Sequence, residues 1–345
     1  MSSSIETPEP ATARPPAAAT DPGPEHTLDA PAASPNDKKA LKVDELVDAW
    51  EGVSLRAGAL LRDPAAPQFL VAAGRIDEEI VSLLDRETER TLLMMVHSAG
   101  AGNERYSVRH SLMVTVVCEL AARLLPGFPP ELRPSLRLAA LTMNIAMTRL
   151  QDQLTLQTTP LTDEQRGLVD GHATQGHQLL TELGVTDELW LQAVLHHHDA
   201  PPGPWAEQSQ ATQLARLVKR ADLFAARMSP RKQRAALSAN AAAKGAYLDE
   251  RKQPDTAGAL IIKALGVYPA GSYVELASGE LAVVLKRGVS ANRPFVAAVA
   301  DSSGSPYVQP APRSTDTRLT EIVRGVPPKD VRVRVPIERL LKLAR

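Results

Sequence analysis

Histidine is the residue type in this chain that is best suited to chemistry. Six of its eight histidines are candidates for a functional site: His97, His110, His172, His196, His197 and His198. Asp222 supplies a carboxylate from a segment further along. Imidazole and carboxylate groups on neighbouring helices are the usual ligands of a first-row metal inside a helical bundle.

The spacing of these histidines leaves two interpretations open. Consecutive helical residues point about 100° apart, so two of the three adjacent histidines 196–198 can face an interior while the third faces solvent. That arrangement suits a metal site. The alternative is that these side chains are surface or helix-terminal histidines, or that His172 and His197 are core histidines bonded to carbonyls.

Helices are predicted over most of the chain, because apolar residues recur at spacings of two to four. The expected helices cover 39–53, 68–97, 107–125, 130–147, 162–182, 186–198, 211–227, a stretch after Ser229-Pro230, and 255–265. Thr162 and Gln165 form a capping box at the start of one of them, and Leu70 is expected in the core of another. Strand patterns follow at 273–278, 281–285, 294–300 and 331–335, before a last helix at 337–343.

These patterns predict a mainly α protein, in which a helical bundle is followed by a small antiparallel β module. The first 37 residues hold eight prolines, eight alanines and no aromatic residue, a composition typical of disorder. We therefore expect a disordered tail at 1–38, a helical region at 39–103, a second helical domain at 104–266, and a basic β-rich module at 267–345.

Composition excludes several classes of protein. A single cysteine among 345 residues excludes a disulfide framework and a thiolate zinc cage. No apolar run reaches the roughly 20 residues that a membrane span needs. The N-terminus has neither a basic start nor an apolar stretch, so we expect a soluble, cytoplasmic protein without a secretory signal.

Charge is distributed unevenly along the chain. From Lys286 to the end, twelve Lys and Arg residues face five Asp and Glu residues, a net charge of +7, whereas the whole chain carries −1. Such a basic end on an acidic body indicates either an anionic partner or contact with the body itself.

The chain resembles the HD-GYP subfamily of the HD phosphohydrolase superfamily from residue 106 to 222, continuing to 279–280. Motifs similar to those of the family occur in its order: YSVRHS at 106–111, LRLAALTMNIAM at 136–147, HATQG at 172–176, HHD at 197–199, and LVKRADLFAARMSPR at 217–231. The resemblance implies a helical HD-type bundle and a metal-dependent phosphodiesterase that hydrolyses cyclic di-GMP. It also implies that His110, His172, His197, His198 and Asp222 are metal ligands, for iron or manganese.

The same comparison shows where this sequence departs from the family pattern. Met143 and Asn144 stand where the family has its His-Asp pair, Met147 stands where it has a lysine, and Ala200–Trp205 replaces its GYP loop. Asparagine is neutral and offers one oxygen, and a thioether is a poor ligand for Fe(II) or Mn(II). We therefore assign no catalytic residue at the His-Asp positions.

Three cationic side chains are further candidates for binding a nucleotide. Arg149 follows the degenerate pair, and Lys219 and Arg220 flank Asp222 on a predicted helix. The alternative is that all three are solvated. Nucleic-acid binding is not favoured, because the strand at 331–334 lacks the interleaved aromatic residues that single-strand binding exploits. Homodimerisation through the helices at 39–98 stays open.

Three functions follow from these observations. In the first, which we favour, the protein is a degenerate HD-GYP-like signalling protein that binds cyclic di-GMP, another nucleotide or a protein partner with weak or absent catalysis. In the second, the remaining ligands form a rearranged metal site that still hydrolyses a phosphoester. In the third, the helices are a scaffold for the basic module. Whether the protein is an enzyme is therefore uncertain from sequence.

Overall fold

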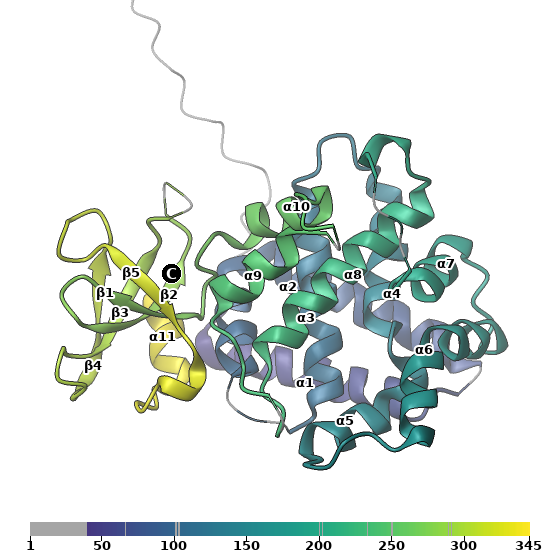
Figure 1. Ribbon diagram of the computed structural model, residues 1–345, viewed down its shortest axis with the longest axis horizontal. Helices are drawn as coiled ribbons and strands as arrows, with labels where there is room; N and C mark the ends of the chain where they lie inside the picture. The colour runs from purple at the N-terminus through teal and green to yellow at the C-terminus, as the bar shows by residue number, and fades with distance from the viewer. Residues whose placement is uncertain are drawn as a thin grey trace, which may run out of the picture. The chain divides into compact units, whose positions relative to one another are not determined.

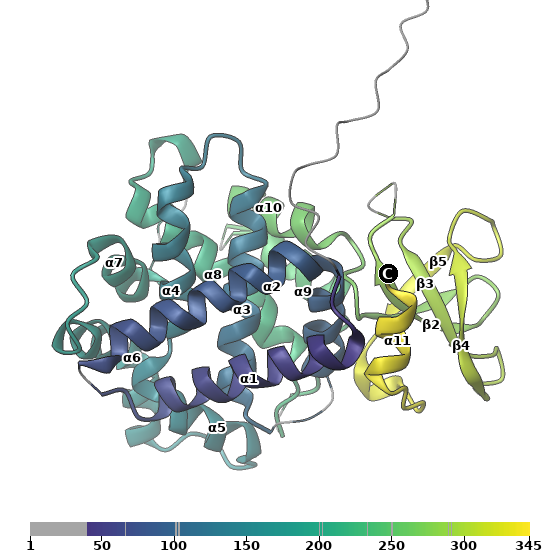
Figure 2. The same cartoon turned by 180° about the vertical axis from the view of Figure 1, so that it is seen from behind.

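Two long helices open the part of the chain that the structure describes. The computed structural model describes residues 40–345 except 66, 101, 103, 200, 202, 233, 250, 289 and 291, so the predicted tail at 1–38 lies outside it. Helices α1 (Val43–Arg62) and α2 (Gln68–Ala99) pack side by side (Figure 2). Leu70 is 42% exposed, contrary to our prediction, because Phe69 and Ala73 take the inward positions of that turn.

The central helix of the bundle is α3 (Tyr106–Arg123). It packs against α4 (Arg133–Thr142), α8 (Gln210–Met228) and α10 (Thr256–Leu265) (Figure 1). Almost every residue of α3 is buried, as expected of a helix that is surrounded on all sides. The remaining helices of the bundle are α5 (Thr148–Leu156), α6 (Asp163–Glu182), α7 (Glu188–His196) and α9 (Ala239–Tyr247).

Several predicted helix boundaries were wrong, including that of the helix expected over 39–53, which continues to Arg62. The helix expected over 130–147 ends at Thr142, because Asn144 leaves the helical region (φ −108°, ψ 17°) and a 3-10 turn follows. The cap of α7 is Asp187, whose carboxylate accepts from two backbone N–H groups, and not Thr186. Ser229 is extended (ψ 132°) and starts no helix, because a following proline disfavours the helical region. The Thr162–Gln165 capping box is confirmed.

The C-terminal part forms a five-stranded antiparallel sheet in the order β4-β3-β2-β1-β5. Its strands are β1 (Tyr273–Leu276), β2 (Leu281–Lys286), β3 (Phe295–Ala300), β4 (Pro306–Ser314) and β5 (Ile322–Val326). Val283 and Ala297 join the main core, whereas Val284 and Val296 join a second cluster on the other face. Helix α11 (Ile337–Leu343) packs against β2 and β4 (Figure 1).

Three features of this sheet differ from the prediction: the segment 331–335, strand β4, and strand β5, which was not predicted. The segment 331–335 is not a strand: its valines are half-buried and its arginines exposed, without a paired neighbour strand. Strand β4 was not predicted, because prolines lack the N–H that a ladder needs. It lies at the edge of the sheet, the position where prolines are tolerated. In the described residues, no helix combines the length and apolar character needed to cross a membrane.

Candidate functional site

Three histidine side chains converge at one point in the bundle. His172 lies on α6, His197 follows the last residue of α7, and His198 comes next. The Nε2 atom of His172 lies 3.2 Å from Nε2 of His197 and 3.1 Å from Nε2 of His198. Among the described residues, these three form the one group of histidine, cysteine or acidic side chains close enough to share a metal ion.

The backbone determines which nitrogen of two rings is free. Nδ1 of His172 lies within hydrogen-bond distance of the carbonyl of Val169, and Nδ1 of His197 lies 2.6 Å from that of Val194. A carbonyl can only accept a hydrogen bond, so each Nδ1 carries the hydrogen. In the neutral rings both Nε2 atoms therefore bear a lone pair and no hydrogen. The two Nε2 atoms are 3.2 Å apart.

Burial keeps these two rings neutral. Burial lowers the pKa of His197 to about 3, and the neighbouring His198 adds to the effect. Burial also lowers the pKa of His172. Neutral imidazole is the form that ligates a metal, so the two buried rings are ready to accept a cation at neutral pH.

A second pair of groups lies beside the three histidines. Nε2 of His110, on α3, donates to Oδ1 of Asp222, on α8, over 2.7 Å. Burial alone would raise the pKa of Asp222, but the hydrogen bond from His110 and the nearby His197 and His198 outweigh it and hold that pKa at about 2. The carboxylate is thus ionised and occupied by His110, within electrostatic range of the histidine cluster.

The residues at the His-Asp positions of the family are buried in the turn after α4. Met143 is fully buried and Asn144 is 5% exposed. A side chain at Gly176 would lie 3.9 Å from the carbonyl oxygen of Met143, so this turn packs against the helix that carries His172. The side chains that this turn offers are a thioether and an amide.

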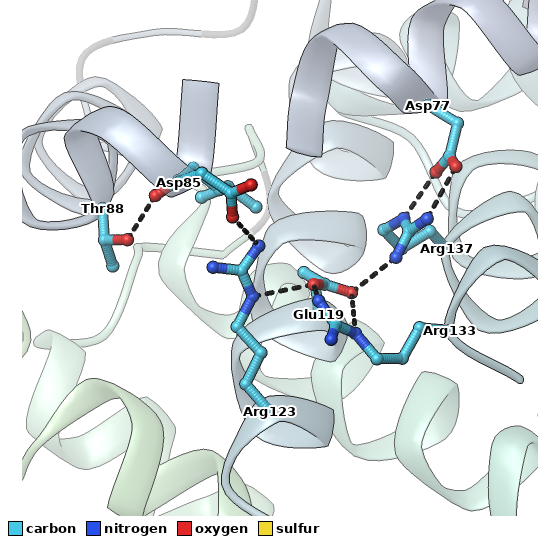
Figure 3. Close-up of polar contacts among 8 residues, drawn as sticks. Asp77, Asp85, Thr88, Glu119, Arg123, Arg133 and Arg137 are labelled. Carbon is cyan, nitrogen blue, oxygen red and sulfur yellow. Dashed lines mark hydrogen bonds and ion pairs between the residues drawn. The ribbon is translucent and has the colours of Figure 1, made fainter. Parts of the chain in front are cut away.

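An ion network holds α4, and with it this turn, against the neighbouring helices. The fully buried carboxylate of Glu119 on α3 accepts from Arg137 at 2.8 Å, from Arg123 at 2.7 Å and from Arg133 (Figure 3). Arg137 also donates twice to Asp77 of α2, at 2.6 and 2.7 Å. Burial would raise the pKa of Glu119, but the three guanidinium groups hold it at about 2.

Two of the three predicted cationic residues bond to groups away from the histidines. Arg149 donates to the carbonyl of Arg62 at the end of α1. Arg220 is buried, donates to the carbonyl of Leu248 and lies 3.6 Å from Asp255. Lys219 is half-buried on the same helix. The roles predicted for these side chains in ligand binding stay predictions.

Two other arginines line a cavity that sequence reasoning missed. This cavity of about 350 Å³ is lined by Met147, Gln151, Val169, Arg231 and Arg234, among others. It borders α6 at Val169, whose carbonyl also holds the ring of His172. The motif SPRKQR at 229–234 was the signal available in the sequence.

Comparison with known proteins agrees with this geometry. Residues 108–227 match the HD domain family. The chain is 29% identical over 221 residues to cyclic di-GMP phosphodiesterase PA4108 of Pseudomonas aeruginosa, an alignment covering 63% of this chain and 52% of the relative. The chain thus spans about half the length of the curated relative that it matches. A comparison with solved structures finds no match.

Proposed function

We propose that this protein, whose residues 108–227 match the HD domain family, is a signalling protein that binds a cyclic dinucleotide of the cyclic di-GMP class. In this proposal it holds one metal ion at His172, His197 and His198, and hydrolyses the dinucleotide slowly or not at all. The relative PA4108 is named as a cyclic di-GMP phosphodiesterase, which supports the choice of ligand class.

The proposal depends on the close approach of two imidazole nitrogens that both bear lone pairs. Nε2 of His172 and Nε2 of His197 are 3.2 Å apart, and neither has a hydrogen to offer the other, because both Nδ1 atoms donate to carbonyls. A cation shared with His198 would satisfy both. Three protein ligands with an open position are the arrangement in which one metal ion binds water or a phosphate oxygen.

Loss of a second metal ion follows from the charges at the turn after α4. Two divalent ions about 4 Å apart repel by on the order of 15 kcal/mol at an effective dielectric of 20. An anionic bridge would offset much of this repulsion, but Asn144 is neutral. Asp222, the one carboxylate in the predicted ligand set, is hydrogen-bonded to His110. We therefore expect the site to bind one metal ion per chain.

The neighbouring cavity supports an anionic ligand. Arg231 and Arg234 both line it, and guanidinium groups suit phosphate oxygens because their donors form a planar fork. Phosphate binding in this cavity would place the ligand beside the ring of His172, whose Nδ1 partner Val169 lines the same space. The dinucleotide would thus be bound by one metal ion and two arginines.

Calorimetric titration of cyclic di-GMP, with and without Mn(II), tests the proposal. We expect binding that is stronger with Mn(II), one equivalent of bound metal, and recovery of intact dinucleotide after incubation. An Arg231→Ala variant should bind more weakly than the wild type, and Arg166→Ala, at an exposed position of α6 that does not line the cavity, is the matched control. Absence of binding in both conditions would contradict the proposal and favour a protein partner.

A second candidate function is metal-dependent phosphodiesterase activity at a rearranged metal site. It is favoured by the free Nε2 atoms of the histidine cluster, since a single ion with an open position can activate water. Chromatography of the titrated samples distinguishes the two: conversion of the dinucleotide to linear product that requires Mn(II) and disappears in His172→Ala would make the protein an enzyme.

A further inference from the structure

A second cavity opens between the N-terminal helices and the HD domain. It has a volume of about 540 Å³ and lies between α1, α2 and α3. Its apolar lining includes Trp50, Met94, Met95, Leu112 and Met113. A cavity of this size and character is typical of sites for small organic molecules.

Two side chains in the wall of this cavity carry nitrogens without a hydrogen-bond partner. Both Arg109 and His110 line it, and in the part of the chain that the structure describes, Nε of Arg109 and Nδ1 of His110 are buried and unpartnered. His110 is 3% exposed. Buried polar atoms are almost always hydrogen-bonded, so two of them at one cavity indicate that something absent from the structure satisfies them.

The chemistry of these two nitrogens specifies complementary groups. Nε2 of His110 donates to the carboxylate of Asp222, so Nδ1 of the neutral ring is an acceptor. Nε–H of Arg109 is a donor. A ligand that satisfies both must offer a hydrogen-bond donor close to an acceptor. Nitrogen heterocycles that carry N–H and bare nitrogen in one ring have this pairing.

The charged groups at the cavity disfavour an anionic ligand, because Asp48, Glu51 and Glu104 line it beside Arg105 and Arg109. Arg105 forms an ion pair of 2.8 Å with Glu51, and both line the cavity. The guanidinium of Arg109 donates to the backbone carbonyls of Ser98 and Gly102. The cations are therefore already engaged, whereas the methionine and tryptophan side chains offer polarizable apolar surface.

We propose that this cavity is a binding site for a small nitrogen heterocycle without negative charge, separate from the histidine cluster and from the cavity of Arg231 and Arg234. The ligand packs on the methionines and hydrogen-bonds Arg109 Nε and His110 Nδ1. This inference goes beyond the proposed function and does not depend on it, since it requires neither metal nor cyclic dinucleotide.

Methionine-methyl NMR of the metal-free full-length protein tests it, with benzimidazole as the probe. Three of the seven methionines line the cavity, namely Met94, Met95 and Met113. Their methyl signals should shift with saturation at millimolar benzimidazole, while the signal of Met147, which lies outside the cavity lining, stays in place. Absence of saturable shifts at these three methyls would overturn the proposal.

Variants identify the site. Ser54→Phe fills the cavity from α1 and should abolish the shifts, whereas Leu55→Phe, at a 58% exposed position that does not line it, should leave them unchanged. His110→Phe keeps the ring shape but removes the acceptor and should weaken binding about fivefold, the effect of one hydrogen bond. Shifts that persist in Ser54→Phe would place the probe elsewhere and refute the assignment.

Discussion

The Nε2 atoms of His172 and His197 face each other across 3.2 Å while both rings donate from Nδ1 to a carbonyl of their own helix. Two lone pairs at this distance are unfavourable unless a proton or a metal ion lies between them. Burial lowers the pKa of both rings, so a proton is not retained at neutral pH. This arrangement supports the metal site that we propose at His172, His197 and His198.

Removing one histidine of the cluster should remove the metal. We expect His172→Ala to weaken Mn(II) binding by more than about 100-fold, because loss of a direct ligand costs more than loss of a supporting group. Calorimetric titration with Mn(II) measures this. His177→Ala, on the same helix but outside the cluster, is the control. Equal loss in both variants would show that the effect comes from the helix and not from ligation.

Restoring the two missing ligands should restore the second metal ion. The double substitution Met143→His and Asn144→Asp replaces a thioether and an amide by an imidazole and an anionic carboxylate. We expect the bound Mn(II) to rise from one to two equivalents, and hydrolysis of cyclic di-GMP to rise by about tenfold or more. Asn144→Gln, which keeps the neutral amide, should do neither. A double variant that stays at one equivalent would contradict our account of this turn.

The network around Glu119 should be important for stability. Glu119→Gln removes the buried anion that Arg123, Arg133 and Arg137 share, although Arg137 keeps Asp77, so we expect the free energy of unfolding to fall by about 3–5 kcal/mol. Urea denaturation measures the change. Asp85→Asn removes another partner of Arg123, and the side chain of Asp85 is 41% exposed. This change should lower the free energy of unfolding by less than about 1 kcal/mol. Similar losses in the two variants would mean that the burial of Glu119 is unimportant.

Stability should fall with acid in a window determined by His197. Its pKa is lowered from 6.5 to about 3 in the folded protein. The unfolded chain therefore binds a proton that the folded state excludes between these values, and stability decreases as the pH falls from 6.5 to 3. The slope that one such group contributes is at most about 1.4 kcal/mol per pH unit.

Urea unfolding of metal-free protein across this pH range measures the effect. His197→Gln should flatten the slope between pH 6.5 and 4.5, and His196→Gln, at the neighbouring exposed position, should not. Below about pH 4.5 a separate loss is expected in both variants, since the pKa of Glu119 is lowered from 4.5 to about 2. A slope that is unchanged in His197→Gln would exclude this ring as its source.

Local signals in the sequence predicted most of the helices. Thr162 and Gln165 begin α6 as a capping box, and Gly266, with φ 81°, ends α10. Such signals depend on neighbouring residues alone, so they are visible without the fold. The break at Asn144 and the edge strand with Pro310 were missed, because each depends on which partner the rest of the chain provides.

The sequence by itself determined which residue types are available: a series of histidines with Asp222, and a turn where Met143 and Asn144 replace a ligating pair. Only the tertiary structure decided their pairing. His110 and Asp222 are 112 residues apart and meet because α3 and α8 pack together. Which imidazole nitrogen is free also depends on carbonyl positions, and these follow from helix packing, which periodicity in a sequence does not encode.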